Sequence, residues 1–292
     1  MNILVCVKQV PDISSVTNLD SGNISIENEY LTCIVNPYDM LAVEEAVRIR
    51  EKSNEGQVIL LSLGRSSALD TLRECLSLGA DKAILLSDAD FDGSDSYSTA
   101  VVLAEAIKQM EFDLILCGVR AVDTNAGQVG SLIASMLDIP LVSAVTNIDV
   151  SPGSQKLIAH RKLEGGNREV IETSLPALLT VEAGINVPRY ASLPVLIAAQ
   201  RKTIEQLGRT ELGLAPEQIR SRDTALQKQG LSIPKPRPKK LFTPDSNLPA
   251  AERMRLIMSG GISEKKTDVL QGNPAEIAAN LLKYLKQEKI VP

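Results

Sequence analysis

The sequence has no tryptophan, three phenylalanines and five tyrosines among its 292 residues. So few aromatic side chains cannot build the stacking platforms on which single-stranded nucleic acids bind. A formal net charge of −5 also argues against binding through phosphate neutralisation. No stretch approaches the roughly 20 apolar residues that span a bilayer, and the apolar start, residues 1–8, is too short for a secretory signal. We therefore expect a cytoplasmic protein that neither binds nucleic acid nor inserts into a membrane.

Histidine and paired cysteines are also scarce, which removes most catalytic and metal-binding chemistry. The single histidine, His160, falls within a predicted strand, so a histidine-based triad has no base. An acidic segment, 88–95, resembles a calcium loop, but Thr99 stands where the closing glutamate is needed. We therefore expect no catalytic side chain and no metal site. None of the cysteines forms a Cys-x-x-Cys pair, and we predict reduced, buried thiols at Cys6, Cys33, Cys75 and Cys117.

The first half of the chain alternates short apolar runs with amphipathic segments. Runs rich in isoleucine, leucine and valine predict strands buried on both faces, at residues 3–7, 58–63, 83–87 and 113–117. Helical spacing and end signals predict helices between them, at residues 37–52, 67–78, 98–110 and 128–137. Asn36 is placed to cap the first of these helices, and Pro37 suits its first position. This alternation indicates an α/β fold with a doubly wound, mostly parallel sheet.

The second half has a different pattern. Residues 142–150, 156–162 and 168–173 are predicted to be antiparallel strands at the sheet edge. A buried strand follows at 176–181, after which 201–227 is charged and helix-prone, and 234–240 is an extended, proline-rich stretch. We predict an α/β domain over 1–200 and a C-terminal arm over 201–292. The arm ends in an amphipathic helix, whose apolar stripe comprises Ile277, Leu281, Leu282, Tyr284 and Leu285.

Candidate ligand-binding residues follow the strands of the parallel sheet, where open α/β sheets bind their ligands. Three segments fall there, at 8–12, 36–39 and 118–130. The third runs from a strand through a glycine-bearing loop into a helix start, where N–H groups and the helix dipole favour a phosphate. It matches neither the Gly-x-Gly-x-x-Gly nor the Walker pattern, contains no lysine and includes Asp123. The segment suits a single phosphate with its sugar, and a purely structural turn is the alternative.

The segment 185–199 displays apolar side chains in what begins as a loop. Tyr190, Leu193 and Ile197 occur there beside Arg189, soon after the buried strand 176–181. Such a segment is either packed against the domain or offered to a partner.

A set of motifs spread over nearly the whole chain occurs in one order: 5–12, 36–39 followed by 42–46, the 118–130 loop, 173–180 and 186–194. Together they resemble the beta subunit family of electron-transfer flavoproteins, and 211–263 departs most from it. The resemblance implies an adenine-nucleotide-binding fold in a heterodimer with a larger alpha subunit. It implies an electron carrier rather than an enzyme, which shuttles electrons from acyl-CoA-type dehydrogenases to a quinone-linked or other acceptor.

The resemblance also assigns cofactors and residues. The alpha subunit carries the redox FAD near the interface, and the beta subunit holds a structural AMP. Tyr38 and the loop around Ile13 would lie towards the flavin, and the terminal helix with its extended lead would embrace the alpha subunit. The nucleotide pocket is assigned to Cys6, Asn36, Pro37, Tyr38, Asp39, Leu63, Gly118, Val119, Arg120, Ala121, Val122, Asp123, Thr124, Asn125, Ala126, Gly127, Gln128 and Val129. Docking is assigned to Arg189, Tyr190, Ala191, Ser192, Leu193 (the anchor), Pro194, Val195, Leu196, Ile197 and Ala198.

Two alternatives stay open. Relatives that bifurcate electrons hold a second FAD in place of AMP and use it to oxidise NADH. That branch reads Asp-Gly-Asp-Thr-Ala-Gln-Val-Gly, whereas this chain has Asn125 and Ala126 at the second Asp and the Thr. The docking segment is also of the non-bifurcating type, so the resemblance favours AMP. A stand-alone adenine-nucleotide-binding module is the other alternative, which the apolar terminal helix and the docking segment disfavour.

Overall fold

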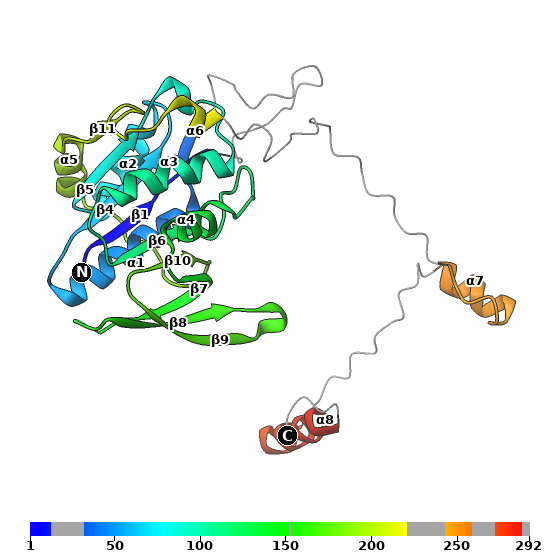
Figure 1. Cartoon of the computed structure of the whole chain (residues 1–292). Helices are drawn as coiled ribbons and strands as arrows, with labels where there is room; N and C mark the ends of the chain where they lie inside the picture. The colour runs from blue at the N-terminus through cyan, green and yellow to red at the C-terminus, as the bar shows by residue number, and fades with distance from the viewer. Residues whose placement is uncertain (13–31, 152, 221–242, 259–271, 288–292) are drawn as a thin grey trace. The chain divides into compact units, whose positions relative to one another are not determined.

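The computed structural model describes residues 1–12, 32–151, 153–220, 243–258 and 272–287 (Figure 1). The chain divides into two compact units, Met1–Ile233 and Pro234–Pro292. The first unit thus extends beyond residue 200, where the sequence placed the end of the α/β domain. The loop around Ile13 and the proline-rich stretch 234–240 lie outside the described residues.

The first unit is built on a nine-stranded sheet in the order β11-β5-β4-β1-β6-β10-β7-β8-β9. The strands from β11 to β7 run parallel, and their central members are fully buried, as isoleucine-, leucine- and valine-rich runs require when helices cover both faces of a sheet. The parallel strands are β1 (Ile3–Cys6), β4 (Val58–Leu63), β5 (Lys82–Leu86), β6 (Leu114–Gly118), β7 (Leu141–Asp149), β10 (Ala177–Val181) and β11 (Glu205–Leu207).

The predicted antiparallel extension is confirmed at one edge. Strand β8 (Lys156–Lys162) pairs antiparallel with β7 and with β9 (Arg168–Ser174). Strand β7 joins the main sheet by pairing parallel with β10. Leu157 and Ala159 of β8 are buried while Ile158 between them is exposed, so this extension is covered on one face only.

Helices cover both faces of the sheet (Figure 1). Apolar side chains of α1, α2 and α5 form one core layer, and those of α3, α4 and α6 form the other. Because side chains alternate along a strand, Ile3 and Val5 of β1 enter the first layer while Leu4 enters the second. The helices are α1 (Pro37–Ser53), α2 (Ala68–Ser77), α3 (Ser96–Lys108), α4 (Val129–Leu137), α5 (Leu193–Arg201) and α6 (Pro216–Arg220).

Several short elements differ from the prediction. Strands β2 (Gln9–Pro11) and β3 (Cys33–Val35) form a small antiparallel sheet in segments read as loops. Residues 193–201 of the docking segment are a helix rather than a loop, and Pro194 suits the first turn of that helix. The helix expected over 201–227 is wrong for its first part, because 205–207 form edge strand β11. Three residues, two of them polar, are too few to give a strand periodicity, so only pairing with β5 reveals this strand.

The second unit contains two described helices, α7 (Ala250–Met258) and α8 (Pro274–Gln287). Helix α8 confirms the predicted terminal helix, and three members of its apolar stripe, Leu281, Leu282 and Tyr284, are about half exposed.

No helix within the described ranges is long and apolar enough to cross a membrane.

The chain changes direction across the sheet between β1 and β6. After β1 it builds β4 and β5 on one side, and it then returns to place β6 on the other. Strands β1 and β6 are paired in register, and helix α1 begins at their carboxyl ends. A Cβ atom on Gly118 would lie 2.3 Å from Oδ1 of Asp39 in α1. Only glycine therefore permits this approach of helix to strand.

We expect Gly118→Ala to lower the free energy of unfolding by about 1–3 kcal/mol, because the added methyl group overpacks a closed contact. Gly64→Ala is the matched control, since its Cβ would meet only ordinary van der Waals contact at 3.5 Å. Urea unfolding of both variants measures the difference, and equal stabilities would refute the contact argument.

Candidate functional site

A cavity of about 480 Å³ opens at the carboxyl ends of β1 and β6. It lies where the strand order reverses, which is the position at which open α/β sheets bind their ligands. Its walls combine polar groups of the 118–130 loop with the apolar side chains of Leu61, Phe91 and Leu103. The predicted pocket residues that line it are Cys6, Asn36, Asp39, Leu63, Gly118, Val119, Arg120, Ala121, Thr124, Ala126, Gly127, Gln128 and Val129.

Sequence reasoning missed one whole wall of this cavity. Residues 94–96 and 99, around the start of α3, line it opposite the 118–130 loop. This stretch follows β5, whose carboxyl end lies at the same sheet edge, so the strand-end rule would have found it. It was read as a solvated loop, yet Asp95 caps α3 by accepting a hydrogen bond from the backbone N–H of Ser98 at 2.8 Å.

Two residues of the 118–130 loop have unusual backbone conformations. Asn125 and Gly127 adopt left-handed conformations with φ of 52° and 63°. Helix α4 then begins at Val129, and its first residues line the cavity together with Gln128. The first N–H groups of a helix have no partner within it, so this end attracts an anion.

Asn36 fastens this loop to the rest of the site. Its side chain is buried, donates to the carbonyl oxygen of Arg120 at 3.0 Å, and accepts from the backbone N–H of Val122 at 3.2 Å. Asn36 stands at the N-cap position of α1 but makes no side-chain capping bond. The predicted capping role is therefore replaced by a bridge to the loop, because a buried amide bonds wherever its donors and acceptors are satisfied.

Five predicted pocket residues do not line the cavity: Pro37, Tyr38, Val122, Asp123 and Asn125. Two of them, Asp123 and Tyr38, instead make contacts that hold the loop in place. Asp123 accepts a 2.6 Å hydrogen bond from the Lys8 ammonium group, and the Tyr38 hydroxyl accepts one from Arg120 at 2.8 Å. The Arg120 guanidinium also lies 5.2 Å from the centre of the Tyr38 ring, within cation–π range.

Asp39 is the buried charge at the base of the site. One carboxylate oxygen accepts from the backbone N–H of Lys8 at 2.8 Å and the other from that of Gly118 at 3.0 Å. The carboxylate thereby joins the ends of β1 and β6. Burial raises the pKa of Asp39 to about 7, against the lowering effect of these hydrogen bonds.

Two thiols form part of the cavity wall. Cys6 ends β1, Cys117 is its register partner in β6, and both side chains belong to the same core layer. Interaction with the neighbouring Cys6 thiol, together with burial, raises the pKa of Cys117 well above its ordinary value. Cys117 is therefore expected to remain a protonated thiol at neutral pH.

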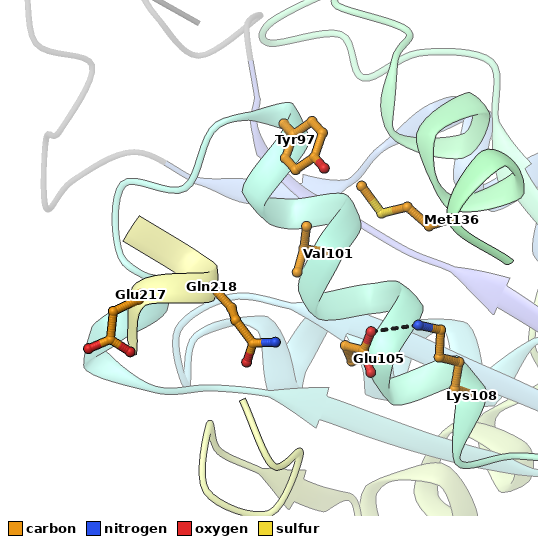
Figure 2. Close-up of a pocket in the computed structure, with 7 residues that line it drawn as sticks. All are labelled: Tyr97, Val101, Glu105, Lys108, Met136, Glu217 and Gln218. Carbon is orange, nitrogen blue, oxygen red and sulfur yellow. Dashed lines mark hydrogen bonds and ion pairs between the residues drawn. The ribbon is translucent and has the colours of Figure 1, made fainter. Parts of the chain in front are cut away.

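A second hollow of about 410 Å³ lies between α3, α4 and α6 (Figure 2). Tyr97, Val101 and Met136 contribute to its lining, and Glu105 and Lys108 form a 2.7 Å ion pair on its wall. None of the residues predicted for a site lies in this hollow.

The segment 186–189 is fastened to α1 by ionic contacts. The guanidinium of Arg189 bonds Glu44 at 3.0 Å and Glu51 at 2.7 Å, and Glu44 is 1% exposed. Burial alone would raise the pKa of Glu44, but hydrogen bonds from Arg189 and Arg48 lower it below its ordinary value. The Asn186 amide adds a bond to Glu45 at 2.9 Å. Arg189 therefore holds the segment in place on α1.

Beyond this anchor the segment turns its apolar side chains outward. Tyr190 is fully exposed and Leu193 is 69% exposed, while Leu196 and Ile197 are more than a third exposed. Ala199, on the same helix α5, is buried in the core layer shared with α2. Spacings of three and four residues place Leu193, Leu196 and Ile197 on one side of α5. We call these three side chains with Tyr190 the apolar face.

Comparisons with known proteins agree on one family. The model of the electron transfer flavoprotein domain matches residues 25–212. An electron transfer flavoprotein subunit beta of Thermoanaerobacterium thermosaccharolyticum is 38% identical over 93% of this chain and 97% of its own. One of Bacillus subtilis is 34% identical over 99% of this chain and 98% of its own. Subunit CarD of the caffeyl-CoA reductase-Etf complex of Acetobacterium woodii is 41% identical over 74% of this chain and 82% of its own.

We expect Asp39 to make stability depend on pH between about 3.8, its ordinary pKa, and about 7. The folded chain holds the proton more tightly than the unfolded chain, so stability from this group falls as pH rises through that window and is level above it. Asp39→Asn removes the titration, so the variant should lose less stability across the window, by at most about 4 kcal/mol. Urea unfolding at several pH values tests this, with the exposed Asp70→Asn as control. An unchanged slope in Asp39→Asn would assign the dependence to other groups.

Proposed function

This chain belongs to the beta subunit family of electron transfer flavoproteins, and we propose that it works as the beta subunit of a heterodimer that shuttles electrons. An alpha subunit would hold most of the redox FAD, which supplies the one-electron chemistry when bound. Acyl-CoA-type dehydrogenases would deliver the electrons, and a quinone-linked or other acceptor would remove them. The observation that carries this proposal is the apolar face, because it is exposed yet adjoins Arg189, which pairs with the buried Glu44 of α1.

A structural AMP fits the cavity at the ends of β1 and β6. Leu61, Leu63 and Phe91 supply an apolar surface for a purine ring. The N-terminus of α4 supplies N–H groups for one phosphate. The two cationic side chains among the lining residues are both engaged, Lys8 with Asp123 and Arg120 with the Tyr38 hydroxyl, so the lining offers little further cationic charge for a longer phosphate chain.

In this arrangement the chain's own residues bind, orient and dock. Asn36 and Asp39 hold the loop and the strand ends in one geometry, so a bound nucleotide meets a prepared site. Leu193 is the most exposed member of the apolar face after Tyr190. An exposed leucine on a rigid helix can fill a pocket on a dehydrogenase and lose its contact with water there.

A second candidate function is an NADH-oxidising subunit that holds a second FAD where we place AMP. It is supported by the relative whose name assigns it to a caffeyl-CoA reductase-Etf complex, with 41% identity. Asn125 and Ala126 argue against it, because they replace the Asp and Thr of the pattern that accompanies a second FAD.

Cofactor content separates these candidates. We expect one FAD and one AMP per heterodimer when the purified complex is denatured and its nucleotides are counted by chromatography. An Asn36→Ala variant should retain less AMP, since its loop loses two hydrogen bonds worth about 1 kcal/mol each, and the surface variant Asn147→Ala is the control. Two FAD and no AMP, with flavin bleaching by NADH, would establish the second candidate instead.

We expect Leu193→Ala to slow electron transfer from a dehydrogenase by roughly tenfold or more, as truncation of an interface anchor does. FAD and AMP content should stay unchanged because Leu193 lies outside the cavity lining. Val170→Ala, an exposed apolar truncation on β9, is the matched control. Stopped-flow reduction kinetics measure the effect, and loss of FAD from Leu193→Ala would contradict the docking role.

A further inference from the structure

The two cavity thiols stand out among the cysteines of the chain. Cys6 and Cys117 are register partners on the central strands and point to the same side of the sheet. Both line the cavity and keep slight exposure, 8% for Cys6 and 5% for Cys117. Cys75 differs because it is fully buried in the opposite core layer. The pair is thus reachable only through the cavity that we assign to a nucleotide.

We propose that Cys6 and Cys117 form a dithiol site that a small peroxide oxidises to a disulfide, and that a nucleotide in the cavity shields the site. The shielding rests on the proposed nucleotide-binding function, whereas the dithiol itself rests only on the placement of the two sulfurs.

The backbone spacing permits this bond. Neighbouring strands of a sheet lie about 4.7–4.9 Å apart, which falls within the Cα–Cα range of roughly 4.4–6.8 Å that disulfides span. It lies at the short end of that range, and neither backbone can move because β1 and β6 are fully paired on both sides. The resulting bond is strained and readily reduced, which is the property of regulatory rather than structural disulfides.

The chemistry balances with hydrogen peroxide as the oxidant. The sulfur of Cys6, the more exposed of the two, attacks one peroxide oxygen, the O–O bond breaks, and a sulfenic acid and one water form. The sulfur of Cys117 then attacks the sulfenic sulfur and displaces its oxygen as a second water, with the thiol proton leaving in that water. The two thiols lose two electrons and the peroxide gains them.

The cavity controls the access of peroxide to the two sulfurs. Peroxide is small enough to enter a space of about 480 Å³, while a nucleotide that fills the same space covers both sulfurs. Occupancy therefore sets the rate of oxidation. The disulfide in turn replaces two thiols on the cavity wall by one fixed sulfur bridge close to Lys8 and Gly118, whose N–H groups hold Asp39, so the oxidised site should bind nucleotide more weakly.

The first test uses the purified full-length chain, with any subunit that co-purifies, depleted of nucleotide and treated with hydrogen peroxide. Digestion without reductant should yield a peptide that joins Cys6 to Cys117, and the intact mass should fall by about 2 Da and return with dithiothreitol. Oxygen addition to separate sulfurs, with no joined peptide, would overturn the proposal. Cys6→Ser and Cys117→Ser should each abolish the mass loss while Cys75→Ser retains it. If a variant does not fold, the joined peptide in the unmodified chain decides alone.

The second test adds AMP, whose binding is measured separately by calorimetry. At 100 times its dissociation constant AMP should slow disulfide formation about 100-fold, because only the empty cavity reacts. AMP that binds without slowing the reaction would overturn the shielding. Absence of AMP binding would overturn the nucleotide assignment, and the joined peptide would still decide whether the dithiol site exists.

Discussion

The buried carboxylate of Asp39 is the contact on which the site depends. It accepts the terminal N–H groups of two neighbouring strand ends, and it comes from a helix that can approach only because residue 118 is glycine. Strand β1, strand β6 and helix α1 are thereby held at one point. A charge in that position is costly to bury, and its pKa of about 7 records the cost. The cavity opens at the strand ends that this carboxylate joins.

Around that contact the first unit carries two different surfaces, the cavity and the apolar face. At the cavity, Asn36 and Lys8 hold the 118–130 loop in place through hydrogen bonds. At the apolar face, Arg189 holds the segment that leads to Leu193 through an ion pair with Glu44. On both surfaces a buried or half-buried polar group on α1 or beside it fixes a loop. Helix α1 therefore supplies contacts both to the cavity and to the segment that carries the apolar face.

Much of the fold could be predicted from residue patterns. The strands 58–63 and 114–118 were found because fully buried parallel strands are continuous apolar runs, and α1 because Pro37 and its apolar spacing mark a helix. The elements that were missed are short. Strand β11 has only three residues, two of them polar, and α5 is apolar on most sides, so neither has a period to detect. The cavity wall at the start of α3 was missed although its position after β5 was visible, because its acidic residues suggested solvent.

The amino-acid sequence alone determined the α/β class, the location of the site after β1 and β6, and the family resemblance, because each depends on local pattern and residue order. Only the tertiary structure decided the roles of single side chains. Arg189, predicted as a docking residue, also pairs with Glu44 and Glu51 of α1, and Asn36 was read as a helix cap and instead binds the 118–130 loop. Likewise Cys6 and Cys117, more than a hundred residues apart, became neighbours. Such partners are brought together by long-range packing, and no local period in the chain encodes them.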